Sequence, residues 1–220
     1  TQQTKPDKAT LDRFLQRRQF KINPELSETE KYAIAEILFE FNDVFVDDLT
    51  QLTGIRVPDV EVTLKPEFEN KRIYKRNYKM SLQDQNECHR QIQELVQADL
   101  AGEATPRASH LYSSPLLLVQ KRGVNVAPRM CLDLRSQNFA VQPAVVSLPH
   151  LQDLIHTTSS RRSKFYTSMD FKSSFFQCRL APGQSRDLFT FTDPVTGIPH
   201  SMFVTPFEYI NSGTHLSQAF

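Results

Sequence analysis

A carboxylate near the end of an apolar run is the group in this sequence best placed for chemistry. The run Phe165–Phe171 predicts a strand, and Asp170 stands near its end. A carboxylate at the end of a buried strand is costly unless it holds a cation or accepts hydrogen bonds. A second block, Arg129–Arg135 with Asn138, lies upstream and carries basic side chains. Together the two blocks predict a site that handles phosphate with the help of a cation.

The charge distribution along the chain agrees with a phosphate-binding role. The net charge is only +1, but residues 107–186 hold 11 Lys and Arg against 3 Asp and Glu, between acidic flanks. A basic middle segment suits contact with nucleic acid or nucleotide phosphates, which give affinity independent of sequence. Solvated basic faces without a ligand are also common, and that alternative stays open.

Composition excludes several other classes of protein. With 220 residues, 39% of them hydrophobic and 23% charged, we expect a globular protein with one domain and an appendage, or two small domains. The three cysteines are not paired as in a zinc ribbon or disulfide framework, and the six histidines lack metal-ligand spacing. Unpaired cysteines favour a reducing compartment, so an intracellular protein is expected, either cytoplasmic or nuclear. No apolar stretch is long enough to span a membrane. The first residue, Thr1 rather than Met, suggests a piece of a longer polyprotein.

The elements that must position these residues follow from periodicity and turn residues. The pair Ser27 and Glu30 predicts a capping box and a helix over residues 28–42, and Ser81 predicts the start of a second helix that Gly102 ends. The stretch 71–79 has five cations around aromatic residues, and either lines a nucleic-acid backbone or is a solvated strand. The remaining expected elements are a short edge strand at 60–64, a hairpin of 116–119 with 129–135, a helix from Leu148, strands at 165–171 and 175–180, and a hairpin of 188–192 with 199–204. The predicted class is α+β.

Five short motifs follow one another along the chain: Ser113-Ser114-Pro115 with 119–123, Arg129 to Asn138, 148–154, Ser168-Met169-Asp170-Phe171, and Thr205-Pro206-Phe207 with Asn211. In this order and spacing, they resemble the reverse transcriptase (RNA-directed DNA polymerase) of gypsy-type LTR retrotransposons. The resemblance covers nearly the whole chain, from about Phe20 to Phe220. It implies the fingers and partial palm of a right-hand polymerase. The implied divisions are a connecting segment with a helix (1–57), fingers (58–147), a palm segment with the first catalytic Asp (148–180), a hairpin returning to the fingers (181–207) and the start of a palm helix (208–220).

The resemblance also implies roles for individual residues. Asp170 is the first catalytic and metal-binding carboxylate, and Lys121 and Arg129 grip the triphosphate of the incoming nucleotide. Phe171 contributes its backbone carbonyl and packing. Phe175 crowds the sugar 2′-position and so selects deoxynucleotides, and Phe207 forms the pocket wall. Asp133 and Arg135 are supporting residues that either brace the basic hairpin or contact the ligand directly; both interpretations stay open.

The sequence departs from the family pattern in ways that bear on activity. The Tyr-x-Asp-Asp hairpin that supplies further carboxylates is missing, so Mg²⁺ is expected only in a complete parent enzyme. Asp47-Asp48 looks like that motif but is expected to be a solvated turn at a helix exit. Ser174 and Glu208 replace family glycines, the second adding negative charge beside the nucleotide pocket.

Three functions compete on this basis. The first is a fragment of a retrotransposon reverse transcriptase, incomplete for catalysis, whose parent is a nucleotidyltransferase that binds primer–template nucleic acid and deoxynucleotides. The second is a domesticated, catalytically dead domain that serves as a protein- or nucleic-acid-binding module. The third is a plain structural domain. A truncated palm would expose a sheet edge, so a homodimer or a protein partner is also expected.

Overall fold

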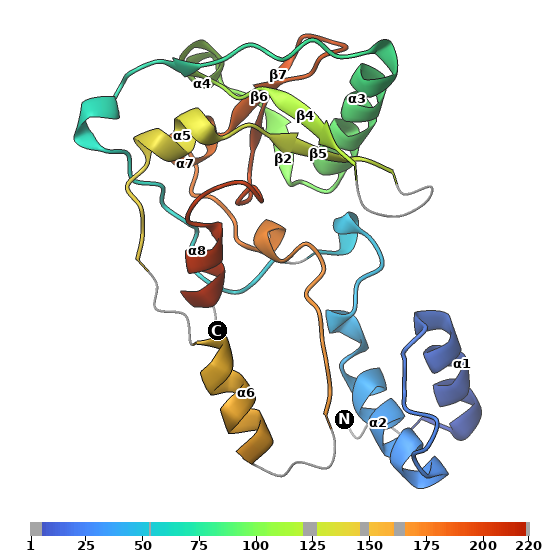
Figure 1. The fold of residues 1–220 in the computed structure, drawn as a ribbon. Coiled ribbons are helices and arrows are strands. Elements are labelled where there is room, and N and C mark those ends of the chain that lie inside the picture. Colours follow the sequence, from blue (N-terminus) through green and yellow to red (C-terminus); the bar gives the residue numbers. More distant parts are fainter. Residues whose placement is uncertain (1–5, 53, 121–126, 146–149, 161–165, 219–220) are drawn as a thin grey trace. The chain divides into compact units, whose positions relative to one another are not determined.

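The computed structural model describes residues 6–52, 54–120, 127–145, 150–160 and 166–218, which form two compact units, 1–47 and 48–220. The sequence placed its first boundary after residue 57, and that division stays a prediction. Figure 1 shows the elements in chain colours. None of the described helices is long and apolar enough to cross a membrane.

The first unit consists of two helices, α1 (Lys8–Arg18) and α2 (Glu28–Glu40), followed by the 3₁₀ helix η1 (Asn42–Val44). The predicted capping box is confirmed, because Ser27 accepts from the backbone N–H of Glu30 and the Glu30 carboxylate accepts from the N–H of Ser27. Phe14 is buried and packs edge-on against Phe39, with ring centroids 5.3 Å apart. An aromatic cluster therefore holds the two helices together.

The Asp47-Asp48 pair has structural partners. Asp47 forms an ion pair with Arg18 at 2.9 Å, and Asp48 accepts from the backbone N–H of Thr50 at 2.8 Å. The second contact caps the 3₁₀ helix η2 (Leu49–Gln51). The Asp48 contact agrees with the expected local role at a helix exit, whereas the Asp47 ion pair joins residues far apart in the sequence.

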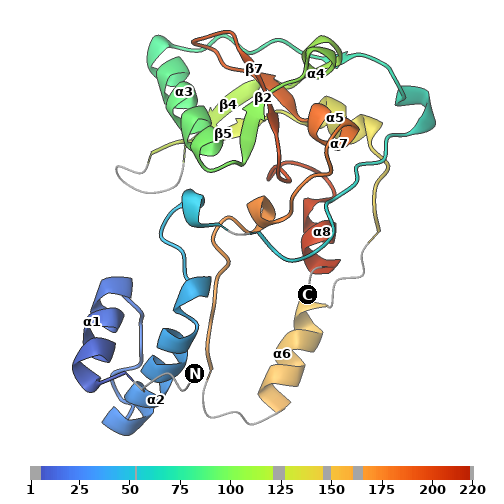
Figure 2. The ribbon, with the colours of Figure 1, turned by 180° about the vertical axis from the view of Figure 1, so that it is seen from behind.

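The second unit is α+β, as the sequence predicted. Its helices beyond η2 are η3 (Pro66–Phe68), α3 (Leu82–Gln97), α4 (Pro106–Leu111), α5 (Arg135–Ala140), α6 (Leu151–Ser160), η4 (Ser174–Gln177), α7 (Gln184–Asp187) and α8 (Ser212–Gln218). Its strands are β1 (Ile73–Tyr74), β2 (Ala101–Glu103), β3 (Tyr112–Ser113), β4 (Leu116–Val119), β5 (Arg129–Leu132), β6 (Thr190–Thr192) and β7 (Pro199–Met202). Helix α3 lies on one side of these strands and α5 and α7 on the other, as the front and back views show (Figures 1 and 2).

The strands form three small sheets. β2, β7 and β6 make an antiparallel sheet with β7 in the middle, β4 pairs antiparallel with β5, and β1 pairs parallel with β3. The hairpins β4–β5 and β6–β7 were both predicted from sequence and are confirmed. The core that joins the sheets contains large, fully buried side chains, among them Tyr112, Phe189, Phe191, Ile92 and Leu116.

Four sequence predictions of elements are wrong. The expected strand at 175–180 is replaced by η4 over Ser174–Gln177, followed only by isolated bridges at Arg179 and Leu180. Residues 166–171 form no strand and are exposed, because no described strand runs alongside them to pair with their backbone. Gly102 does not end the second helix: α3 stops at Gln97 and Gly102 belongs to β2, paired with Ser201. Residues 60–64 make only isolated bridges, at Val60 to Leu180 and Leu64 to Val141, although their alternating side chains are buried as predicted.

Candidate functional site

The β4–β5 hairpin presents Arg129 at its exposed end. Arg129 opposes Val119 in the register and shares a strand face with the buried Cys131. Gln91 of α3 fixes the start of β5, since its side chain donates to the carbonyl of Pro128 and accepts from the N–H of Met130, both at 2.9 Å. The helix therefore holds the residues that flank Arg129 in place.

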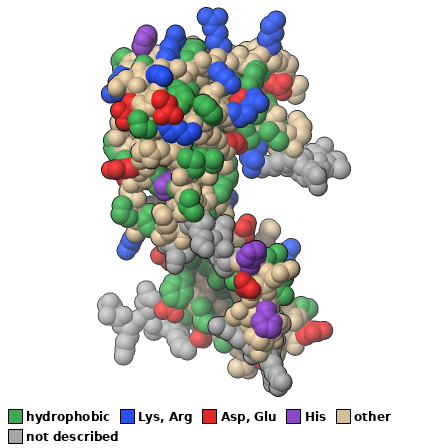
Figure 3. Space-filling view, turned by 60° about the vertical axis from the view of Figure 1, so that its left-hand side comes forward, with side chains coloured by type: hydrophobic (Ala, Val, Ile, Leu, Met, Phe, Trp, Pro, Cys, Tyr) green, Lys and Arg blue, Asp and Glu red, His purple; other side chains and the backbone are tan. Residues whose placement is uncertain are grey.

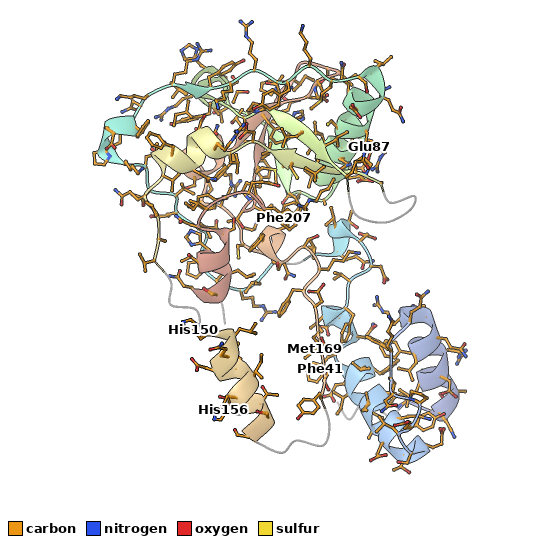
Figure 4. All side chains as sticks on the ribbon, viewed as in Figure 1. Phe41, Glu87, His150, His156, Met169 and Phe207 are labelled. Atoms are coloured by element: carbon orange, nitrogen blue, oxygen red, sulfur yellow. The ribbon has the colours of Figure 1, made fainter. Side chains whose placement is uncertain are left out.

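Arg129 lies over an aromatic cluster. Its guanidinium carbon is 5.1 Å from the ring centroid of Phe207, a cation–π contact. The Phe207 ring packs edge-on against Phe175 at 5.6 Å and lies tilted against Phe176 at 4.8 Å. Phe207 lies beneath the hairpin, toward α8 and η4 (Figure 4). The structure thus brings together Arg129, Phe175 and Phe207, three of the sequence-predicted nucleotide-binding residues, whose roles stay predictions.

Backbone and hydroxyl contacts position this cluster. Thr205 donates its hydroxyl to the carbonyl of Phe175 at 2.6 Å and its N–H to the carbonyl of Cys178 at 2.9 Å. Ser212, at the start of α8, donates its hydroxyl to the carbonyl of Pro206 at 2.7 Å. The loop that carries Phe207 is therefore tied to η4 on one side and to α8 on the other. Sequence reasoning missed Phe176, because no pattern in the sequence separates it from an ordinary core ring.

A carboxylate stands close to the same site. Burial, followed by the nearby Glu208 carboxylate, raises the pKa of the Cys131 thiol to about 11, whereas Arg129 acts in the opposite direction. Glu208 and Arg129 therefore both lie beside this thiol. Asn138 fixes the Glu208 backbone, since its side chain donates to the Glu208 carbonyl at 2.8 Å. An anionic ligand at Arg129 would meet the negative charge of Glu208.

Asp133 and Arg135 form a clamp together with Tyr78, a residue that the sequence did not single out as a site residue. The Asp133 carboxylate is buried and accepts from Nε and a terminal nitrogen of Arg135 at 2.8 and 2.6 Å. It also accepts from the Tyr78 hydroxyl at 2.5 Å. The Arg135 guanidinium, with Tyr78, holds the pKa of the Asp133 carboxyl well below its usual range. These bonds match the bracing interpretation of Asp133, while Arg135 keeps 78% of its side chain exposed.

Asp170 and Phe171 lie in the exposed extended segment that precedes η4; Met169 of the same segment is labelled in Figure 4. The described residues offer Asp170 no hydrogen bond or ion pair, and no described contact joins it to Arg129. Phe171 is 55% exposed. Lys121, the other predicted triphosphate ligand, lies outside the described residues.

Magnesium was predicted only for a complete parent enzyme, and that prediction stays open; the described residues alone do not make up a magnesium site. Mg²⁺ in two-metal polymerase sites needs several converging oxygen ligands. The part of the chain that the structure describes contains no group of three or more His, Cys, Asp or Glu placed to hold a metal ion. Asp170 alone offers one carboxylate.

Comparison with solved structures identifies the fold. The foamy viral protease–reverse transcriptase in complex with an RNA/DNA hybrid superimposes with a TM-score of 0.69 and 16% identity over 98% of this chain. The prototype foamy virus protease–reverse transcriptase gives a TM-score of 0.72 and 19% identity over 90% of this chain. This chain has a reverse-transcriptase-like fold. It spans 27% and 25% of the length of those two chains. No protein-family profile and no curated protein sequence matches it.

Proposed function

We propose that this chain is the fingers and part of the palm of an RNA-directed DNA polymerase of the gypsy-type retrotransposon kind. The observation that carries the proposal is the Arg129, Phe175 and Phe207 cluster. A guanidinium over an aromatic wall, at the end of a hairpin, offers a nucleotide a charge for its phosphates and a flat surface for its sugar and base.

In this proposal each member of the cluster has one task. Arg129 binds the triphosphate oxygens in bidentate fashion. Phe175 occupies the space beside the sugar 2′-carbon and excludes a 2′-hydroxyl by shape. Phe207 supports both, because it contacts the Arg129 guanidinium and the Phe175 ring. Asp170 would supply the first carboxylate for a metal that stabilises charge during phosphoryl transfer, in a parent with further carboxylates.

Nucleotide crosslinking tests the pocket directly. A photoreactive dATP analogue, added with a primer–template whose next template base is thymine, should label the chain. Arg129→Ala should reduce the labelling about tenfold, as loss of a charge-assisted hydrogen bond predicts. Arg179→Ala is the matched control, since Arg179 pairs with Asp99 and has no contact with the cluster among the described residues. Equal labelling of both variants and the wild type would contradict the proposal.

The partner class in this proposal is a primer–template duplex with deoxynucleotides. The support is the fold, since the solved neighbours include reverse transcriptases in complex with double-stranded DNA and with an RNA/DNA hybrid. Phosphate contacts make such binding fall steeply with salt. Salt-insensitive binding would point to a protein partner instead.

We also propose that the 220-residue chain alone is incomplete for catalysis, because its sequence has no Tyr-x-Asp-Asp motif. Primer extension with magnesium and deoxynucleotides should give no incorporation above background. Measurable synthesis by the purified chain would refute this point while leaving the nucleotide pocket untouched.

The second candidate, a domesticated binding module, is favoured by the charge of Glu208 beside Arg129. A carboxylate there competes with a triphosphate for the guanidinium. If this candidate holds, the chain should bind primer–template, and nucleotide crosslinking should stay at background until Glu208→Gln removes the charge. Strong crosslinking by the wild type would eliminate it.

A partner that covers exposed apolar surface belongs to the same proposal. Leu151, Leu154 and Ile155 form one stripe of α6 and are 70%, 49% and 59% exposed. We propose that a second copy or another protein covers this stripe. Light scattering at several concentrations should show a mass that rises with concentration, and Leu154→Glu should abolish the rise. An intracellular location is likewise proposed, since Cys88, Cys131 and Cys178 are free thiols.

A further inference from the structure

A second basic surface shares no residue with the aromatic cluster around Phe207. We call it the β1 groove: a depression of about 570 Å³ between η3, β1 and α5, lined by Phe68, Lys71, Arg72, Tyr74, Lys75, Arg135 and Phe139 together with Ile73 and Ser136. Figure 3, turned toward this side, shows Lys and Arg side chains gathered on the upper part of the second unit. Its size is that of an ordinary ligand site.

The backbone explains why Arg72 and Tyr74 face outward here. Ile73 of β1 is buried and opposes Tyr112 of β3 in the parallel pair. Because side chains alternate along a strand, Arg72 and Tyr74 turn to the opposite, solvent-facing side. The Arg72 guanidinium lies 4.4 Å from the Tyr74 ring centroid.

Three of the four cations that line the groove lack carboxylate partners among the described residues, whereas the fourth, Arg135, pairs with Asp133. Lys71, Arg72 and Lys75 form no ion pair with any described residue, and the lining contains no Asp or Glu. Lys71 instead lies over the Phe68 ring at 5.6 Å. Three like charges in one groove repel one another, so an anionic ligand with several charges would relieve the repulsion.

An exposed aromatic platform lies beside these charges. Phe139 of α5 keeps 67% of its surface exposed, although its ring packs edge-on against Phe68 at 5.6 Å and Lys65 lies 4.8 Å from its centroid. An exposed large ring flanked by cations suits a flat base that stacks while its phosphates meet the cations. A duplex hides its base faces, and an acidic peptide has no base to stack.

We propose that the β1 groove binds single-stranded nucleic acid, with backbone phosphates on Lys71, Arg72 and Lys75 and a base stacked on Phe139. RNA and DNA strands share this chemistry. The inference goes beyond the proposed function, because the groove uses neither Asp170 nor the cluster around Arg129. Its success or failure is therefore independent of the polymerase proposal.

Fluorescence anisotropy of the whole chain with a labelled oligo-dT or oligo-U of about ten nucleotides tests the groove. The variant Lys71→Ala/Arg72→Ala/Lys75→Ala removes three phosphate contacts. At about 0.7 counterions per contact, its affinity at about 0.1 M salt should fall about 100-fold, and the slope of log K against log salt should shrink by about 2. The matched control, Arg13→Ala/Arg17→Ala/Lys21→Ala, removes three exposed cations from the first unit and should retain the slope.

The stacking contact has its own pair of variants. Phe139→Ala should weaken binding about tenfold, whereas Phe139→Trp should restore it, since every base can stack on an indole. Circular dichroism confirms that each variant is folded. Equal losses in the two triple variants, wild-type affinity in Phe139→Ala, or displacement of the oligonucleotide by poly-glutamate of equal charge would each overturn the proposal.

Discussion

Replacing Asp133 by Asn should separate bracing from ligand contact at the clamp. The carboxylate keeps only 4% of its side chain exposed and accepts three side-chain hydrogen bonds, two from Arg135 and one from Tyr78. An amide has one acceptor oxygen, so at least one charge-assisted bond is lost and an NH₂ group faces donors. One such loss costs about 2 kcal/mol of unfolding free energy.

The exposed guanidinium limits that magnitude. In Asp133→Asn the Arg135 guanidinium loses its ion pair but can bind water instead, so losing the pair itself destabilises the chain little. Most of the loss in unfolding free energy arises at the buried position 133. A loss of about 2 kcal/mol in a chain of this size lowers Tm by about 4–8 °C. Differential scanning fluorimetry and urea denaturation at neutral pH measure both quantities.

The pH dependence gives an independent check. The pKa of Asp133 is lower in the folded chain than its usual value, so its contribution is fully present above the unfolded pKa of about 3.9 and is lost as pH falls toward the folded pKa. The difference in unfolding free energy between wild type and Asp133→Asn should stay constant from about pH 8 to pH 5. It should become smaller below about pH 4. A difference under about 0.5 kcal/mol at neutral pH would refute the reasoning.

Arg135→Lys distinguishes the two roles of the arginine. A bracing role needs the bidentate fork toward Asp133, whereas a direct role needs the same fork toward a phosphate, and lysine lacks it in both cases. We expect this variant to lower Tm but to retain affinity for nucleic acid. The reverse result, normal Tm with weakened binding, would favour direct ligand contact.

Three further outcomes are expected. Asp193→Asn should destabilise the chain by about 2 kcal/mol in urea titrations, because the buried carboxylate accepts from the backbone of Val195 at 2.9 Å and from His89 at 2.7 Å; an unchanged midpoint would contradict this. Burial raises the pKa of the Cys88 thiol to about 11, so iodoacetamide at about pH 8 should modify it only after urea is added, and rapid modification of the native chain would show an open core. Leu116→Ala, at a fully buried position, should cost about 2–5 kcal/mol, whereas Leu82→Ala, 73% exposed, should change stability by less than about 0.5 kcal/mol.

Local signals in the sequence predicted local structure well. Ser27 and Ser81 cap α2 and α3 as expected, since each side chain accepts from a backbone N–H three residues on. The hairpins followed from apolar runs separated by turn residues. In each case residues close in sequence supply the stabilising contacts, so no knowledge of the rest of the fold was needed.

Elements that depend on distant partners were not predictable in the same way. The run Phe165–Phe171 has strand composition, but a strand forms only where another backbone pairs with it. The parallel pair of Ile73 with Tyr112 joins residues far apart in sequence, and nothing local to either residue indicates the other. Tyr78 was noticed only as part of a basic stretch, because its bond to Asp133 exists only in the folded chain.

The candidate site, too, depends on contacts between distant residues that the sequence alone does not indicate. Arg129, Phe175 and Phe207 were chosen by family resemblance rather than by periodicity, and their proximity depends on the loop that Thr205 ties to Phe175. Phe176, which also packs on Phe207, follows no pattern that would separate it from an ordinary core ring.

The position of β7 in the middle of its sheet has a consequence for synthesis on the ribosome. Ala101 of β2 pairs with Met202 of β7, which is made about 100 residues later. At about 5–20 residues per second, β2 waits for about 5–20 s before its neighbour leaves the exit tunnel. During that interval its unpaired edge and the apolar side of α3 are open to chaperones and to misassociation. Codon changes that slow translation between these strands should therefore lower the soluble yield without altering the finished protein.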